Sequence, residues 1–101
     1  MTESKLQSAI NQDLRELKIN FHHVEKGRGR NQTHRKGFPD LAIFPGDGRV
    51  FFVEIKSADG RLKPAQVLFK AWCKDFKYKF YVVSDLKTWK YIKKLEGLIH
   101  A

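Results

Sequence analysis

Two acidic residues and one lysine in the middle of the chain have the types needed to cut a phosphodiester bond. Asp40 begins one apolar segment, and Glu54 and Lys56 stand two residues apart in the next. Because side chains alternate faces along a strand, Glu54 and Lys56 share one face. Carboxylate and carbonyl oxygens are the ligands that hard cations such as Mg²⁺ prefer, and a lysine beside them can stabilise a phosphate or orient a water. These types indicate metal-assisted phosphodiester hydrolysis, provided that Asp40 meets Glu54.

The turn between the two segments decides whether these carboxylates meet. The segments flank Pro45-Gly46-Asp47-Gly48, which is a strong hairpin signal. A three-residue loop pairs Leu41 with Val53 and keeps one face apolar throughout, whereas a four-residue loop mixes apolar and charged side chains. We therefore predict the three-residue loop, which sets Asp40 directly opposite Glu54. Two carboxylates so placed repel each other, and both stay ionised only when a cation lies between them.

The elements that must position these residues follow from hydrophobic periodicity, caps and turns. We expect the order α-β-β-β-α-β-α, in which a helical crossover makes the last two strands parallel neighbours in one sheet. The expected helices begin at a Thr2 cap and run to Lys18, from Pro64 to Phe76, and from an Asp85 cap; the expected strands are 20–25, 39–44, 49–57 and 78–83. The side chains expected to be buried along the first and last helices are Leu6, Ile10, Leu14, Leu17, Leu86, Trp89, Ile92 and Leu95.

Composition limits the class of protein. The chain has 101 residues, 20 lysines and arginines against 11 acidic residues, and a formal charge of +9. This length predicts a single domain over 1–101, and the charge predicts a polyanionic partner, with nucleic acid first. The longest apolar run, Val50 to Val53, is too short for a membrane span, and the single cysteine, Cys73, excludes an internal disulfide. We expect a cytoplasmic protein with no membrane partner.

A basic segment precedes Asp40. Residues 26–36 contain five lysines and arginines, two glycines, no acidic residue and no aliphatic or aromatic residue. Glycine amides and arginine side chains suit phosphates, so we predict a loop that binds DNA and becomes ordered on binding. The residues expected to contact DNA are Lys26, Arg28, Arg30, His34, Arg35 and Lys36.

The motif residues resemble the signature of the PD-(D/E)XK nuclease superfamily, and their context resembles its VRR-NUC family. That family combines a helical Glu, Gly-x-Pro-Asp-Leu, a strand ending Val-Glu-x-Lys, and Leu-x-x-x-Gln leading into a helix. The matching residues here are Glu3, Gly37-Phe38-Pro39-Asp40-Leu41, Val53-Glu54-Ile55-Lys56 and Leu62-Lys63-Pro64-Ala65-Gln66. An isolated Glu-x-Lys is a weak signal, whereas the ordered set across most of the chain is a strong one.

The resemblance implies a fold and a set of roles. The fold would be a restriction-endonuclease-like α/β core, with a mixed sheet flanked by helices. Asp40, Glu54 and the main-chain carbonyl of Ile55 would bind Mg²⁺ or Mn²⁺, and Glu3 would approach the metal directly or through water. Lys56 would act on the water or the phosphate. Gln66 would reach the site from the first turn of the second helix.

The resemblance also implies a substrate and an assembly. Family members that consist of the bare domain look like phage or bacterial enzymes, and they are homodimers that act on branched DNA, in particular four-way (Holliday) junctions. A dimer is physically reasonable, because symmetric cleavage of a junction needs two active sites. The chain also has more large aromatic side chains than so small a core must hide, among them Trp72, Phe76, Tyr81 and Tyr91.

Simpler interpretations stay open beside these roles. Glu54 and Lys56 could form an ion pair on a strand, and Glu3 could complement the helix dipole. Gln66 stands at the third helical position, where glutamine caps helices, so a structural role is as well supported as a functional one. At the level of function, the alternatives are a non-catalytic nucleic-acid-binding module on a nuclease scaffold, or a nuclease for flaps, nicked duplex or RNA.

Overall fold

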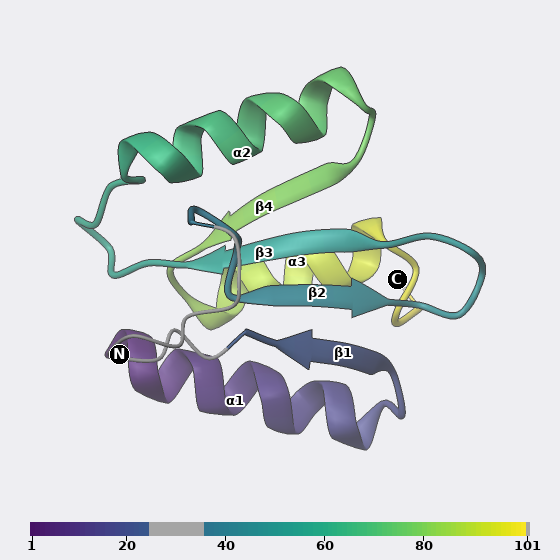
Figure 1. Cartoon of the computed structure of the whole chain (residues 1–101). Helices are drawn as coiled ribbons and strands as arrows, with labels where there is room; N and C mark the ends of the chain where they lie inside the picture. The colour runs from purple at the N-terminus through teal and green to yellow at the C-terminus, as the bar shows by residue number, and fades with distance from the viewer. Residues whose placement is uncertain (25–35, 101) are drawn as a thin grey trace.

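The computed structural model describes residues 1–24 and 36–100, and the elements follow the predicted order α-β-β-β-α-β-α (Figure 1). The helices are α1 (Glu3–Glu16), α2 (Pro64–Asp75) and α3 (Leu86–Leu95), and the strands are β1 (Asn20–His23), β2 (Leu41–Phe44), β3 (Phe51–Ile55) and β4 (Lys79–Val83). All four strands are shorter than expected, and Glu25 lies outside the described residues. The predicted caps are confirmed: the Thr2 hydroxyl accepts a hydrogen bond from the Lys5 amide, and the Asp85 carboxylate accepts one from the Thr88 amide.

The four strands form one mixed sheet in the order β1-β2-β3-β4. β1 and β2, and β2 and β3, are antiparallel, whereas β3 and β4 are parallel, as the α2 crossover between them predicts. Leu41 pairs with Val53 and Ile43 with Phe51, which is the register of the three-residue hairpin loop. The mixed sheet and its register therefore confirm the predicted α/β class.

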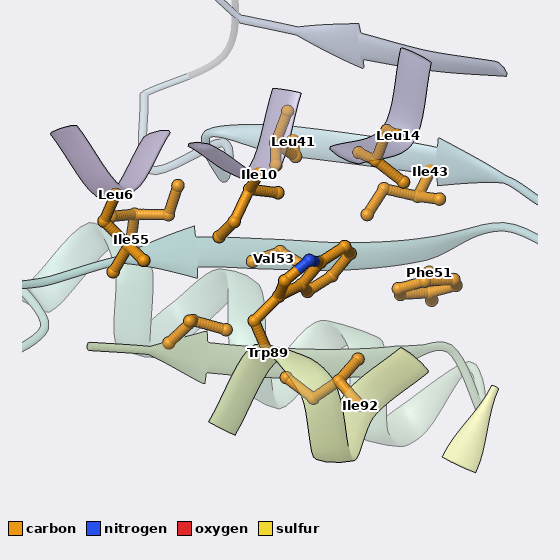
Figure 2. Close-up of a cluster of buried hydrophobic side chains, with 11 residues drawn as sticks. Leu6, Ile10, Leu14, Leu41, Ile43, Phe51, Val53, Ile55, Trp89 and Ile92 are labelled. Carbon is orange, nitrogen blue, oxygen red and sulfur yellow. The ribbon is translucent and has the colours of Figure 1, made fainter. Parts of the chain in front are cut away.

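Helices cover both faces of the sheet, with α2 on one face and α1 and α3 on the other (Figure 1). Figure 2 shows the core under α1 and α3, where Trp89 lies among aliphatic side chains from α1, β2 and β3. The Asp13 carboxylate joins the two helices, since it accepts a hydrogen bond from the Trp89 indole at 2.8 Å and pairs with the Lys93 ammonium at 2.6 Å. On the other face, Phe52 and Phe69 pack between β3 and α2 with their ring centroids 5.3 Å apart.

The expected burial along α3 is wrong at both ends of the helix. Trp89 and Ile92 are buried, but Leu86 is 44% exposed and Leu95 is 55% exposed. At 3.6 residues per turn, each three-residue step moves a side chain by about 60° around the helix, so four such positions cover half of its circumference. Only the two middle positions, Trp89 and Ile92, can face the sheet, and the next buried side chain is that of Glu96. Leu17, the residue that follows α1, is half-buried rather than buried.

Within residues 1–24 and 36–100, no helix is both long and apolar enough to cross a membrane.

Candidate active site

The hairpin loop between β2 and β3 fixes the alignment of the two carboxylates. Gly46 and Gly48 have φ angles of +98° and +85°, which glycine adopts without strain. Asp47 between them accepts hydrogen bonds from the backbone amide and the guanidinium of Arg49. Because Leu41 pairs with Val53, the residue before β2 stands opposite the fourth residue of β3. Asp40 and Glu54 are therefore aligned on the face covered by α2.

The Asp40 side chain is fixed by the neighbouring strand. Its Oδ2 accepts a hydrogen bond from the backbone amide of Ile55 at 2.7 Å, and its main-chain carbonyl accepts one from the Val24 amide at 2.8 Å. The carboxylate therefore bridges from β2 to the residue that directly follows Glu54. This contact orients Asp40 before any ligand binds.

Glu54 is 1% exposed and lies under the first turn of α2. Its Oε2 accepts a hydrogen bond from Gln66 Nε2 at 3.2 Å, while Gln66 Oε1 accepts one from the Lys63 amide at 2.8 Å. One side-chain amide thus caps α2 and contacts the buried carboxylate. The structural and functional interpretations of Gln66 are compatible, because its two ends make different contacts.

Lys56 directly follows β3, and its backbone amide donates to the Val83 carbonyl at 2.9 Å, which continues the pairing with β4. The side chain is half-buried. By strand alternation it extends on the same face as Glu54. The region thus contains two carboxylates, a main-chain carbonyl at Ile55 and one ammonium group, all at the edge where α2 begins.

Gly37 permits the chain before Asp40 to approach the first turn of α2 closely. The sequence patterns did not reveal this role. The φ angle of Gly37 is +85°, and a Cβ added there would lie 2.4 Å from the main-chain oxygen of Ala65. The segment leading to Asp40 therefore lies directly against the first turn of α2, next to Gln66. Phe38 anchors this segment by packing against Phe69 with a 5.2 Å centroid distance. The Gly in the Gly-x-Pro-Asp motif was the signal that could have indicated this contact.

The structure does not gather Glu3 with the other two acids. Glu3 is exposed in the first turn of α1, and the part of the chain that the structure describes contains no cluster of three or more His, Cys, Asp or Glu side chains suited to a metal. Leu6, one turn further along α1, lies beside Ile55 (Figure 2). The N-terminal end of α1 is therefore at the Ile55 end of β3.

Of the six residues expected to bind DNA, five lie in 25–35 and thus outside the described residues. They are Lys26, Arg28, Arg30, His34 and Arg35. Lys36 is described and exposed, directly before the Gly37 turn.

A polar network that sequence reasoning missed holds β1 against α1. Asn11 is only 7% exposed; its Oδ1 accepts a hydrogen bond from Gln7 at 2.8 Å, and its amide nitrogen lies 3.1 Å from His23 Nδ1. His23 pairs with Leu41, the residue after Asp40. Gln7 and Asn11 are four residues apart on one helix, a spacing that could have indicated this network.

The VRR-NUC domain model matches residues 1–87, and the chain belongs to this family of nuclease-type domains. Among solved structures, a "VRR_NUC domain" is similar to this chain with a TM-score of 0.74 and 21% identity, over 93% of this chain and 98% of that one. No curated protein matches the chain.

Proposed function

We propose that the chain is a divalent-metal-dependent DNA endonuclease that hydrolyses phosphodiester bonds. The observation that carries this proposal is the hairpin register, which aligns Asp40 with the buried Glu54 on the face that also carries Lys56. Membership of a nuclease-type family supports it independently.

The donors fit a hard divalent cation. Asp40 and Glu54 supply carboxylate oxygens and Ile55 supplies a carbonyl, and Mg²⁺ typically binds one or two carboxylates while keeping several waters. These three donors therefore suit Mg²⁺ or Mn²⁺ without a third acidic side chain. Glu3 would not be a direct ligand in this arrangement, or would contact the cation through water. A bound cation would supply charge to screen the phosphate and to acidify a water.

The protein's own groups would orient the reaction. The Ile55 amide holds Asp40, and Gln66 holds Glu54, so both carboxylates keep their positions without reorganisation. Lys56 would donate to a phosphate oxygen or to the attacking water, where its fixed positive charge stabilises the charge that develops. Gln66 acts here as a positioning residue, since its described contact is with Glu54.

Cleavage assays with Lys56→Ala test the reaction. Wild type should cleave DNA with Mg²⁺ or Mn²⁺ and not with chelator, and Lys56→Ala should lose at least a hundredfold of the rate. Lys94→Ala, which removes an exposed lysine on α3, is the matched control and should keep the wild-type rate. Cleavage that survives chelation, or survives the loss of Lys56, would contradict the mechanism.

The alternative functions give different results in the same assay. A non-catalytic binding module would bind DNA and cleave none of the substrates, although the intact Asp40, Glu54 and Lys56 argue against it. A panel of four-way junction, flap, nicked duplex, linear duplex and RNA separates the substrate classes. We propose selectivity for branched DNA such as the four-way junction, so linear duplex should be cleaved more slowly.

A homodimer would supply the two active sites that symmetric junction cleavage needs. The outer face of α2 supports this assembly, because Val67 and Leu68 are neighbours on that helix and are 50% and 70% exposed. Exposed apolar side chains grouped in this way are typical of interfaces. Leu68→Glu should weaken the dimer in sedimentation experiments, whereas Leu95→Glu, at an exposed leucine of α3, should not. Dissociation by Leu95→Glu alone would place the interface on α3.

A further inference from the structure

A second basic region lies at the opposite end of the sheet from the carboxylates. A hollow of about 540 Å³ is lined by Lys70, Lys74, Lys77, Tyr78, Lys79 and Phe80, which we call the lysine groove. It lies where α2 ends and β4 begins. Because Lys79 pairs with Phe51, at the start of β3, the groove is at the other end of that strand from Glu54.

Folding gives no reason to gather these four lysines. No acidic side chain lines the groove, and within residues 1–24 and 36–100 none of the four lysines forms an ion pair. Ammonium groups brought together in this way repel one another unless an anion lies between them. The groove is therefore complementary to a ligand that carries several negative charges.

The aromatic side chains give the groove a rigid wall. Tyr78 is stacked on Trp72 with a centroid distance of 5.4 Å and an interplanar angle of 18°, and its ring contacts Phe52 edge-on. Tyr78 nevertheless remains 40% exposed. The lysines thus extend from a packed surface, which lowers the entropy lost when a ligand binds.

Helix α2 connects the groove to the candidate active site. Its first turn carries Gln66, which contacts Glu54, and its last turn carries Lys74. Gln66 and Lys74 are eight positions apart on this helix, so they are separated by about 12 Å at 1.5 Å per residue. That distance equals roughly three to four base-pair steps at 3.4 Å per step.

We propose that Lys70, Lys74, Lys77 and Lys79 bind the phosphate backbone of the DNA arm that leads away from the cleaved bond. This inference rests on the proposed function, because it takes DNA to be the substrate. Lysines that contact phosphates position a duplex without reading its sequence. The groove would hold the arm at a fixed distance from Asp40 and Glu54, and so align the scissile phosphate with them.

Binding measurements in chelator, where no cleavage is expected, test the groove directly. The variant is Lys74→Ala/Lys77→Ala, and the matched control is Lys87→Ala/Lys94→Ala, which removes the same charge from exposed positions on α3. The probe is a labelled four-way junction with arms of about 12 base pairs, titrated at several salt concentrations. The groove variant should lose about 0.9 units of log–log salt slope per lost phosphate contact, close to two units in all, and the control should keep the wild-type slope.

The arm phosphates give a second readout. In a junction with long arms whose phosphates beyond about the third base pair are replaced by uncharged methylphosphonates, the groove meets no charge, so wild type and the groove variant should bind it equally. Equal slopes for the groove variant and the control, or an equal loss on the methylphosphonate junction, would overturn the proposal. If the groove variant bound DNA as wild type does but bound phosphatidylserine vesicles more weakly than wild type, the proposal would also be overturned, because the groove would then bind a membrane surface.

The outcomes separate the groove from the nuclease activity. If wild type cleaves DNA and the groove variant keeps the wild-type salt slope, DNA binding by the groove is contradicted and the endonuclease activity is supported. If wild type binds the long arms through the groove but cleaves no substrate, the endonuclease activity is contradicted and DNA binding by the groove is supported. Thermal unfolding should show the same midpoint for all variants, because the substituted lysines are exposed.

Discussion

Two buried glutamates lie at opposite ends of this small sheet, and their surroundings differ. Glu96 is 6% exposed and is paired with the Arg49 guanidinium at 2.5 Å, while the Tyr81 hydroxyl donates to its other oxygen. Glu54 is 1% exposed, is aligned with Asp40 and accepts a hydrogen bond from the neutral amide of Gln66. The first carboxylate is matched to a cation of the fold. The second is aligned with another carboxylate, and this alignment is the basis of the proposed metal site.

The contrast between Glu54 and Glu96 predicts that substitution by glutamine lowers the cleavage rate at one position and the free energy of unfolding at the other. The most severe effect on function should come from Glu54→Gln, which keeps the shape of the side chain but removes its charge. We expect about a thousandfold loss of cleavage rate, which corresponds to about 4 kcal/mol of transition-state stabilisation. The free energy of unfolding, measured in urea, should stay within about 1 kcal/mol of wild type, because a buried charge is removed rather than exposed. Full cleavage activity in this variant would refute the role of Glu54.

Glu96→Gln should have the opposite effect. It removes the buried one of the two carboxylates that contact the Arg49 guanidinium and leaves Asp47, so we expect a loss of about 2 kcal/mol in the free energy of unfolding. The cleavage rate of the remaining folded protein should equal that of wild type. If this variant lost activity without losing stability, the contrast between the two glutamates would be wrong.

Gly37→Ala should sharpen the comparison by disturbing the candidate active site through the backbone. The new Cβ would lie 2.4 Å from the Ala65 carbonyl oxygen, at a φ of +85°. We expect a loss of about 2 kcal/mol in stability and a lower cleavage rate, because Asp40 and Gln66 would move apart.

Gly48→Ala is the matched control, since Gly48 has the same φ but open space around it. It should cost about 1 kcal/mol in the free energy of unfolding and leave the cleavage rate unchanged. Equal effects of the two substitutions on cleavage would show that backbone conformation alone, and not the contact with Ala65, matters at position 37.

The smallest effect should appear only at high pH. Burial, and then the hydrogen bond to Glu96, raise the pKa of Tyr81 above its ordinary value of about 10. The unfolded state therefore loses this proton at lower pH than the folded state, and folding stability falls as the pH rises above about 10. Wild type should lose at most about 1.4 kcal/mol per pH unit more than Tyr81→Phe over this range. Parallel stability curves above pH 10 would contradict this assignment.

Local patterns predicted the parts of the molecule that depend on neighbouring residues. The period-two alternation around the glycine-containing loop was enough to predict the pairing of Leu41 with Val53, and with it the alignment of Asp40 with Glu54. The crossover between β3 and β4 was likewise readable, because a helix between two strands makes them parallel.

Contacts between distant residues could not be predicted in this way. Arg49 and Glu96 are 47 positions apart, so no spacing rule links them, and the burial of Glu96 was missed while that of Leu95 was expected. The close approach of Gly37 to Ala65 and the two contacts of Gln66 depend on how α2 lies over the sheet. Sequence alone indicated which residue types belong to the site, and the packing of α2 decides how they are held.

The two contacts of Gln66 have a consequence for the order in which activity is gained during folding. The first turn of a helix is its least favourable part to form, because several residues are fixed for a single hydrogen bond. Here the same side chain that closes this turn also orients Glu54. A newly made chain would therefore remain a latent enzyme until the crossover helix has nucleated, and refolding experiments should find that cleavage returns together with helix α2 and not before it.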